Sequence, residues 1–520
     1  MMVSPGPAEV GAQDGSLTLL TAGYVLPGAC ADALLHDGGV VVGGSRILDV
    51  GDAAELQRKW PAATTLTFPG CLLMPGLVNA HQHGRGISQI QLGHRDDYLE
   101  TWISGRRSRG VLDPGAITRL AAARMLANGV TTTIHANYSY GTGDYAGEVR
   151  TQIAAYADVG LRATVCVGAM DRGQLVYPPH EVCFLAGLDP ELRAWLGRAA
   201  APAYAGGIEQ TIALMADLRA EFGTHPLIRL CYGPAGPQWV SDDLWRAIAR
   251  DARDHDLGIH LHALESPAQR TAAAELFPGG VFNHLSDLGV MTSRTVVAHG
   301  VWVDPAEIEV LAASDATVVH NPGCNLRMRN GIAPLAAYLK GGVRLAVGTD
   351  NCALDDEEDL LAELRLAANL ARVPEWRGAE PPGSDVLLAM ATHNGAVAAQ
   401  FGAETGMLEA GRRADIAVFS LERTSSPYLD PDVPVVDAFL ARANGRDAVM
   451  TMVDGTIRYC NGSYPGLSVD ALQVQAADAA RSARRPADIA DIPHAAGYRH
   501  ALGEHYRQLA RARAGDREGS

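Results

Sequence analysis

Lysine is nearly absent from this sequence: Lys59 and Lys340 are the only two among its 520 residues. Positive charge is therefore carried almost entirely by arginine, and the formal net charge is −16. The sequence also contains no basic tract, and phosphate binding requires clustered Lys and Arg. We therefore expect no nucleic-acid partner.

Paired cysteines and long apolar runs are missing as well. The eight cysteines are scattered and form no Cys-x-x-Cys pair, which argues against a disulfide framework or a structural zinc site and predicts a reducing, cytoplasmic location. The first residues lack the basic and apolar regions of a signal peptide. No stretch of about 18 apolar residues occurs, so no membrane association is expected.

The composition is that of a globular protein, with 47% apolar and 20% charged residues. From Gly70 onward, apolar runs with β character alternate with amphipathic helical stretches. The runs predicted as strands are Leu72–Asn79, Val130–Ala136, Leu161–Gly168, Leu227–Tyr232, Leu257–Leu261, Thr295–Ala298, Ala316–Val319 and Val343–Gly348. This alternation predicts an α/β fold, a (β/α)8 TIM-like barrel. An open doubly wound sheet is less favoured, because no glycine-rich phosphate loop follows the first run.

The two ends of the chain differ from its centre. Short strand-like segments separated by Gly and Asp occupy residues 17–50 and 405–459. We expect residues 1–70 and 404–460 to form one small composite β-sandwich beside a barrel of residues 71–403. The remaining residues, 461–520, are rich in Ala and Arg and are expected to form a helical or disordered tail.

Polar side chains stand where several of the predicted strands end. His81 and His83 follow the first run, and both can reach one point because alternate residues of a strand face the same way. The carboxyl ends of barrel strands meet at one mouth. Later runs bring to that mouth His260, His262, Glu265, His299 and Asp350. Imidazole and carboxylate ligands with an open position suit Zn(II) or Fe(II).

These segments resemble the amidohydrolase superfamily, in its mononuclear branch of deaminases and chlorohydrolase-like enzymes. The matching segments are Pro75–His83, His262–Glu265, Ala298–Gly300, His320–Asn325, Gly348–Asp350 and Gly406–Ile416. Two positions depart from the family's pattern. Cys324 stands where relatives usually carry Ser, and Gly84-Arg85-Gly86 makes the loop after the histidines flexible and basic.

The resemblance implies one divalent metal ion, Zn or alternatively Fe, Mn or Ni, with the ligands His81, His83, His262 and Asp350. His260 shares the strand face of His262, but only His262 is followed by Glu at the third position, so His260 ranks below it. Binuclear members bridge two metals with a carboxylated lysine, commonly from strand four, and the run Leu227–Tyr232 has none. One metal is therefore expected, with Cys231 as an unusual bridge the less favoured alternative.

The resemblance also implies the catalytic residues Glu265, His299 and Asp350. A bound divalent metal lowers the pKa of its water towards about 7, and Asp350 and His299 are expected to hold that water and take its proton. Glu265 is expected to carry a proton to the substrate by general acid–base catalysis. The alternative for Glu265 is a solvated residue at the start of the next helix.

Six further side chains are predicted to contact substrate: Trp102, His135, His320, Asn325, Gln91 and Arg85. Three of them lie in the long segment after the first strand, where barrels of this kind place substrate loops. Core packing explains Trp102 equally well. His135 and His320 end the second and seventh runs, and each either contacts substrate or supports other site residues. The acidic run 355–359 is expected to cap a helix N-terminus rather than bind metal.

The predicted function is the hydrolysis of a C–N bond in a small molecule. The leading expectation is deamination of an amino-substituted N-heterocycle of purine, pterin, pyrimidine or triazine type. An amide, urea or carbamate hydrolase of the same superfamily is the alternative, and a non-catalytic assembly protein on the same scaffold is the remote one. The resemblance further implies a homo-oligomer, a dimer or larger.

Overall fold

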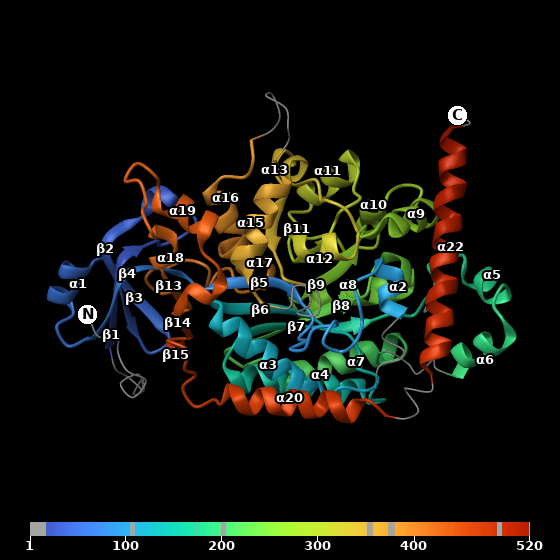
Figure 1. Ribbon diagram of the computed structural model, residues 1–520, viewed down its shortest axis with the longest axis horizontal. Coiled ribbons are helices and arrows are strands. Elements are labelled where there is room, and N and C mark those ends of the chain that lie inside the picture. Colours follow the sequence, from blue (N-terminus) through green and yellow to red (C-terminus); the bar gives the residue numbers. More distant parts are fainter. Residues whose placement is uncertain are drawn as a thin grey trace.

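The computed structural model describes residues 17–104, 110–173, 175–198, 204–350, 357–372, 380–485 and 491–518. A barrel surrounded by helices occupies the centre of the molecule, and a smaller sheet lies beside it at one end (Figure 1). Two helices from the end of the chain lie along the outside of the barrel.

Parallel strands form the barrel, in the order β12-β11-β10-β9-β8-β7-β6-β5 among the described residues. They are β5 (Leu77–Gln82), β6 (Val130–Ala136), β7 (Arg162–Ala169), β8 (Ile228–Pro234), β9 (Gly258–Ala263), β10 (Thr295–His299), β11 (Thr317–His320) and β12 (Arg344–Val347). A bridge between Gln82 and Asp350 links β5 to the segment after β12, so the ring is nearly closed. The predicted barrel is confirmed.

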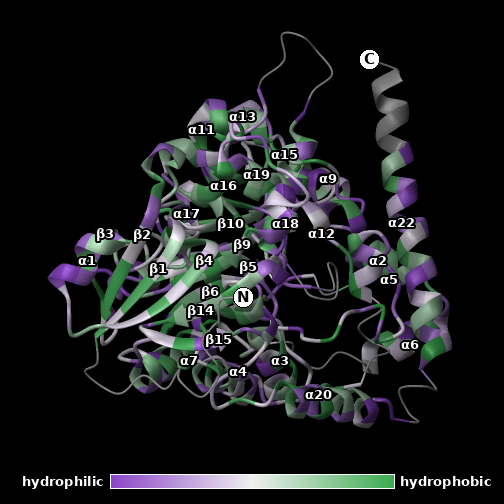
Figure 2. Cartoon of the chain, turned by 60° about the vertical axis from the view of Figure 1, so that its left-hand side comes forward, coloured by the Kyte–Doolittle hydropathy of each residue, from purple (hydrophilic) through white to green (hydrophobic). Residues whose placement is uncertain are grey.

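The strands are apolar because both of their faces are covered. β6, β7 and β9 are buried along their whole length, as expected of parallel strands between helices and a filled barrel interior. The interior is packed with residues of small and medium size, including Val78, Ile134, Val296 and Val319. Figure 2 shows apolar residues concentrated on the central strands, with hydrophilic residues along the outer faces of the helices.

Helices follow most barrel strands and cover the outside. Those in the first half are α2 (Leu99–Ser104), α3 (Pro114–Ala127), α4 (Tyr145–Val159), α5 (Glu181–Ala186), α6 (Pro190–Arg198), α7 (Ile208–Phe222), η4 (Pro237–Trp239) and α8 (Asp242–Asp254). Those in the second half are α9 (Pro267–Leu276), α10 (Val281–Asp287), α11 (Pro305–Ala313), α12 (Pro322–Arg327), α13 (Leu335–Gly341), α15 (Leu360–Leu370), α16 (Ser384–Ala391) and α17 (His393–Ala398). The side chain of Asp359 accepts from the amide of Ala362 and caps α15, as predicted for the acidic run; residues 355 and 356 lie outside the described ranges.

Strands from both ends of the chain form the small domain, as predicted, but in the described residues they pair in one continuous sheet and not in the two sheets of a sandwich. Its sheet has the order β15-β14-β13-β4-β1-β2-β3 within the described part of the chain. The strands are β1 (Leu17–Val25), β2 (Leu35–Gly43), β3 (Arg46–Asp52), β4 (Thr64–Pro75), β13 (Ile416–Ser420), β14 (Ala448–Val453) and β15 (Thr456–Cys460). Neighbouring strands run antiparallel except β1 and β4, which are parallel. The short helices of this region are η2 (Ala31–Ala33), α1 (Ala53–Lys59), α18 (Glu422–Ser425), α19 (Val435–Arg442) and η5 (Gly445–Asp447).

The first predicted strand, Leu72–Asn79, is divided between the two sheets. Its first residues belong to β4, which pairs with β13 from Cys71 to Pro75, and the barrel begins at Leu77. The boundary expected between residues 70 and 71 therefore falls inside β4. Gly76 joins the two strands in a space where a Cβ atom would lie 2.1 Å from Cγ2 of Thr131.

A buried arginine joins the barrel to the small domain. Arg162 of β7 is fully buried and donates two hydrogen bonds to Asp415, each 2.8 Å long, and a third to Asp454 at 3.1 Å. Two carboxylates around one guanidinium compensate the cost of removing these charges from water.

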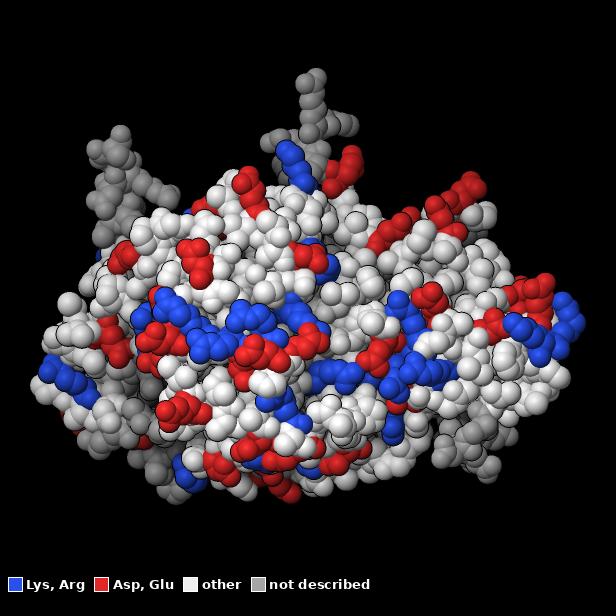
Figure 3. Space-filling view, turned by 180° about the vertical axis from the view of Figure 1, so that it is seen from behind, with Lys and Arg blue, Asp and Glu red and all other residues white. Residues whose placement is uncertain are grey.

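The last segment of the chain is helical where the structure describes it. α20 (Val469–Ala483) packs on α3 through Leu472 and Ala476, and α22 (Ile492–Glu518) packs on α2 and α6. None of the helices in the described ranges is both long and apolar enough to cross a membrane. On the face shown in Figure 3, acidic and basic side chains are interspersed.

Candidate metal centre and active site

Four histidines and an aspartate converge at the carboxyl ends of β5, β9, β10 and β12. His81, His83 and Asp350 each place a ligand atom within 4.8 Å of the others, and so do His81, His262 and His299. Oδ1 of Asp350 lies 3.0 Å from Nε2 of His83 and 3.6 Å from Nε2 of His81. The most exposed of the five, His262, has only 6% of its surface accessible.

The backbone is strained at two of these positions. His299 has a φ of 74° and Asp350 a φ of 63°, in the left-handed region that costs a non-glycine residue on the order of 1–3 kcal/mol. The amide of Asp350 donates to the carbonyl oxygen of His81 at 2.9 Å, which holds the aspartate against β5. Strain of this kind clusters at functional sites.

The donor atoms fit a divalent cation. Nδ1 of His83 bonds the carbonyl oxygen of Ala136 at 2.6 Å, so it carries the proton and leaves Nε2 with a free lone pair. Nε2 of His81 and Nε2 of His262 are buried without a hydrogen-bond partner among the described residues. Three imidazole nitrogens and one carboxylate oxygen thus face one buried space. Together they form a ligand set that Zn(II) or Fe(II) accepts.

The charge states of these groups agree with metal binding. Burial lowers the pKa of His81 to about 4 and that of His262 well below its usual value, so both imidazoles are neutral at pH 7. Burial raises the pKa of Asp350, but its contacts with His81 and His83 lower it by more, so the carboxylate stays ionised. Metal ligands must be deprotonated in this way.

Further polar side chains hold the candidate ligands in place. Nε2 of His260 lies 2.8 Å from Nδ1 of His81, so this histidine contacts a candidate ligand. Asn79 donates to Thr349 at 2.7 Å and to Glu358 at 3.2 Å, and so connects the strand of His81 with the segment before Asp350. Outer contacts of this kind orient ligands and tune affinity.

Glu265 lies beside His299 and away from solvent. Its Oε1 is 3.6 Å from Nε2 of His299 and accepts a hydrogen bond from Asn330 at 2.9 Å. Burial raises the pKa of Glu265 to about 7. The carboxyl is thus able to donate or accept a proton near neutral pH, and the alternative of a solvated residue does not apply, since Glu265 is buried.

Asn325 and His320 lie on the His299 side of the mouth. Oδ1 of Asn325 is 3.0 Å from Nδ1 of His299, and Nε2 of the same ring lies 3.7 Å from Asp350 Oδ2. His320 ends β11, and burial lowers its pKa to about 4. Asn325 therefore orients His299.

Two of the remaining residues predicted to contact substrate are engaged by other parts of the protein. Both ring nitrogens of His135 have protein partners, Tyr156 at 2.7 Å and Gln152 at 3.4 Å, which gives this residue a supporting position behind the mouth. Gln91 is exposed, and its side chain bonds the backbone of its own loop. Neither geometry directs the side chain at the candidate ligands.

Trp102 and Arg85 lie in buried positions. Trp102 packs with Leu99, Cys324 and Met328, so the departure at Cys324 adds to an apolar cluster. Arg85 is 5% exposed and has no ion pair within the described residues. Its guanidinium lies over the ring of Tyr140, 4.6 Å from the centroid.

Tyr138 is a site residue that the sequence reasoning missed. Its ring stacks on His83 at a centroid distance of 4.4 Å and lies parallel to His262 at 6.0 Å. It follows β6 by two residues, so an aromatic side chain just beyond a barrel strand was the available signal. The half-buried ring forms an apolar wall beside two candidate ligands.

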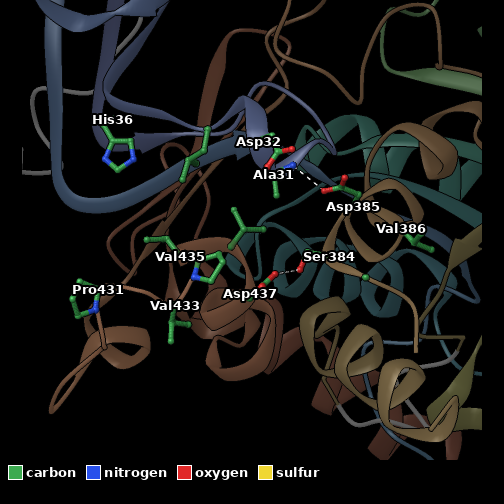
Figure 4. A pocket seen from close by; sticks show the side chains of 14 residues that line it. Ala31, Asp32, His36, Ser384, Asp385, Val386, Pro431, Val433, Val435 and Asp437 are labelled. Atoms are coloured by element: carbon green, nitrogen blue, oxygen red, sulfur yellow. Dashed lines mark hydrogen bonds between the residues drawn. The ribbon is translucent and has the colours of Figure 1, made fainter. Parts of the chain in front are cut away.

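Two other features are not candidates for a metal centre or an active site. Cys231 packs in the barrel interior with Cys166 and Val296. A hollow of about 600 Å³ lies between η2, α16 and α19 (Figure 4). Of its three carboxylates, Asp385 accepts from the amide of Ala31 and Asp437 from the hydroxyl of Ser384, so these two are engaged within the protein.

Comparisons with known proteins agree with this geometry. The profile of the amidohydrolase family matches residues 72–458, and that of a bacterial imidazolonepropionase-like composite domain matches residues 38–63. A 5'-deoxyadenosine deaminase of Methanosarcina acetivorans is 29% identical over 429 residues, which are 81% of this chain and 88% of the relative. A 5-methylthioadenosine/S-adenosylhomocysteine deaminase of Thermococcus kodakarensis is 29% identical over 84% of this chain and 93% of its own.

Solved structures share the fold over most of this chain. An adenosine deaminase of Xanthomonas campestris with bound zinc superposes with a TM-score of 0.76 at 26% identity, covering 90% of this chain and 98% of its own. The zinc complex of atrazine chlorohydrolase from Arthrobacter aurescens has a TM-score of 0.74 at 23% identity, covering 89% of this chain and 100% of its own. At that identity the second likeness concerns the fold alone.

Proposed function

The chain belongs to the amidohydrolase family, and on that premise we propose that it is a metal-dependent aminohydrolase that removes ammonia from an amino-substituted N-heterocycle. The observation that carries the proposal is the position of a buried proton donor, Glu265, 3.6 Å from His299 at the edge of the candidate metal centre. A metal site alone would serve storage or structure, whereas a carboxyl with a pKa of about 7 beside it provides acid–base chemistry.

We assign His81, His83, His262 and Asp350 as the residues that hold the cation. When bound, a divalent cation polarises a water molecule and so supplies a nucleophile at neutral pH. Asp350 Oδ2 and His299 Nε2, which lie 3.7 Å apart, would accept the proton of that water. Glu265 would donate its proton to a ring nitrogen as the water oxygen bonds to the carbon that carries the amino group. The proton held by Asp350 or His299 would pass to that amino group as the C–N bond breaks and ammonia leaves, and the remaining hydroxyl proton would return to Glu265.

The walls of the site support a planar, partly polar substrate. The ring of Tyr138 offers a stacking face beside His83. Arg85 offers a buried guanidinium without an ion pair in the described ranges, which suits a polar or anionic substituent. The names of the relatives, which are adenosine-type deaminases, support a purine nucleoside or a related heterocycle as the first substrate class to examine.

We further assign zinc as the metal, because the adenosine deaminase of similar structure contains it and the imidazole–carboxylate set suits it. A cytoplasmic location and a homo-oligomeric state stay predictions from the sequence. The amide, urea or carbamate hydrolase is distinguished from the deaminase by the product that leaves.

Ammonia release from a panel of adenosine-type nucleosides, pterins, aminopyrimidines and aminotriazines tests the proposal. We expect turnover on at least one heterocycle, and a loss of about 10²- to 10⁴-fold in kcat when Glu265 is replaced by Gln, the range typical of a general acid. Glu309→Gln on the exposed face of α11 is the matched control and should behave as wild type. Release of an alkylamine or arylamine without ammonia would instead favour the alternative hydrolase.

A further inference from the structure

The C-terminal helix α22 lies beyond the residues that the family profile matches, which end at 458. It does not stand free of the barrel. Ala495, Tyr498 and Leu502 pack into an apolar cluster with Val176 and Trp195, from the segment after β7 and from α6. Figures 1 and 2 both show α22 beside α2, α5 and α6 at one side of the barrel.

Hydrogen bonds lead from this helix towards the proton donor. The hydroxyl oxygen of Tyr506 accepts from the backbone N–H of Tyr177 at 3.2 Å. The hydroxyl of Tyr177 donates to Oε1 of Glu100 on α2 at 2.9 Å. Ser266 donates its hydroxyl to the same oxygen of Glu100, and Ser266 is the residue next to Glu265 in the chain.

Glu265 depends on this turn for its position. Its amide donates to Oε1 of Gln269 at 2.9 Å, and the amide of Gln269 donates to the hydroxyl oxygen of Ser266 at 3.1 Å. Ser266 is therefore the N-cap of α9 and the partner of Glu100 at once. The preceding residue, Leu264, has a left-handed φ of 51°, a conformation that surrounding contacts must maintain.

The residues that link α22 to Glu265 are packed inside the protein and do not form a solvated surface. Tyr177 is 3% exposed, and its ring lies 5.6 Å from the ring of Tyr506 and 5.3 Å from that of Trp239. Burial raises the pKa of Glu100, so its contacts with Ser266 and Tyr177 compensate a real desolvation cost. Both donors meet one carboxylate oxygen, which fixes the distance between α2 and the start of α9.

We propose that α22 positions the proton donor of the active site. Through Tyr506 and Tyr177 the helix holds Glu100, and Glu100 holds the turn that carries Glu265. The proposal rests on the function assigned above to Glu265. In it Glu100 and Tyr506 are positioning residues, which act on the reaction only through the placement of the proton donor.

The test compares variants that keep or remove the acceptor at position 100. Glu100→Leu should lower kcat about 10- to 100-fold with little change in KM, because a displacement of about 1 Å at a reacting group has an effect of this size. Glu100→Gln keeps an oxygen that accepts from both Ser266 and Tyr177, and it should retain most of kcat. Glu100→Leu and Glu100→Gln with equal kcat would overturn the proposal.

A second measurement keeps the proposal testable where activity is not observed. In the full-length protein, Tyr506→Phe should increase amide hydrogen exchange at residues 264–269, measured by mass spectrometry, because the N–H of Tyr177 loses its acceptor. Arg507→Gln, whose side chain pairs with Glu504 on the same helix, is the control and should leave exchange unchanged. Unchanged exchange in Tyr506→Phe overturns the role of the helix, whereas a wild-type protein inactive on every heterocycle overturns the proposed function alone.

Discussion

Replacing Glu265 by Gln is expected to make the metal-free protein more stable, although the same change lowers kcat in the metal-bound enzyme. The buried carboxyl of Glu265 has a pKa of about 7, compared with an ordinary value of 4.5. Below pH 4.5 it is protonated in both the folded and the unfolded state. As the pH rises from 4.5 to 7, the unfolded state loses a proton that the folded state keeps, so the free energy of unfolding decreases.

The size of the effect follows from the two pKa values. One pH unit corresponds to about 1.4 kcal/mol, so the penalty reaches about 3 kcal/mol above pH 7 and is absent below pH 4.5. Gln has nearly the same shape, keeps an oxygen for the hydrogen bond from Asn330, and cannot ionise. The variant should therefore exceed wild type by about 3 kcal/mol at pH 8 and match it at pH 4.5.

Urea unfolding followed by circular dichroism at a series of pH values measures this difference. The protein is kept in a chelator, because a bound cation would favour the ionised carboxylate. Glu309→Gln on the exposed face of α11 controls for the loss of a surface charge. The reasoning is refuted if Glu265→Gln is no more stable than wild type at pH 8, or if it is equally stabilised at pH 4.5.

Three further outcomes are expected. Arg162→Ala should lower the free energy of unfolding by about 3–5 kcal/mol, because Asp415 is left buried and unpaired; a loss below 1 kcal/mol in urea unfolding would contradict it. Gly84→Ala should lower the free energy of unfolding by at least about 1–2 kcal/mol, because Gly84 has a left-handed φ of 64°. It should also reduce bound metal, because the new Cβ would lie 2.4 Å from Cε1 of His135; full metal content would count against this. In the holoenzyme, kcat/KM should fall as the pH rises through the pKa of Glu265, because the proton donor loses its proton; a limb that stays flat to pH 9 would argue against that role.

The barrel and the candidate ligands were accessible from the sequence because the signal is local. Each strand is a short apolar run, and the candidate site residue stands at or just beyond its end, as with His299 at the end of β10 and Asp350 after β12. The convergence of those ends is a property of the fold class. Residues such as His81 and Asp350, far apart in the chain, could therefore be placed together without any long-range information.

Where the prediction failed, tertiary contacts decided the outcome. The run Leu72–Asn79 contains two buried strands in series, and apolar character alone cannot separate them, so only the pairing of β4 with β13 reveals the break at Gly76. For His135, also at a strand end, the sequence left open whether it contacts substrate or supports other residues; in the structure Tyr156 and Gln152 contact its ring nitrogens.

The supports of the site could not be predicted from the sequence either. Asn79 and Glu358 are 279 positions apart and meet only in the folded chain. The link from Tyr506 to Tyr177 spans 329 positions and has no motif of its own. Local patterns therefore predict the candidate ligands and the proton donor, whereas the contacts that position them depend on packing between distant segments.

The metal content of Asp350→Ala, measured by plasma mass spectrometry together with turnover, tests the central claim most directly. The account predicts one divalent ion per wild-type chain, and a variant that loses most of this ion and the activity with it. Asp437→Ala, in the separate hollow between η2, α16 and α19, is the matched control and should keep both. An Asp350→Ala protein with a full complement of metal and wild-type turnover would contradict the account.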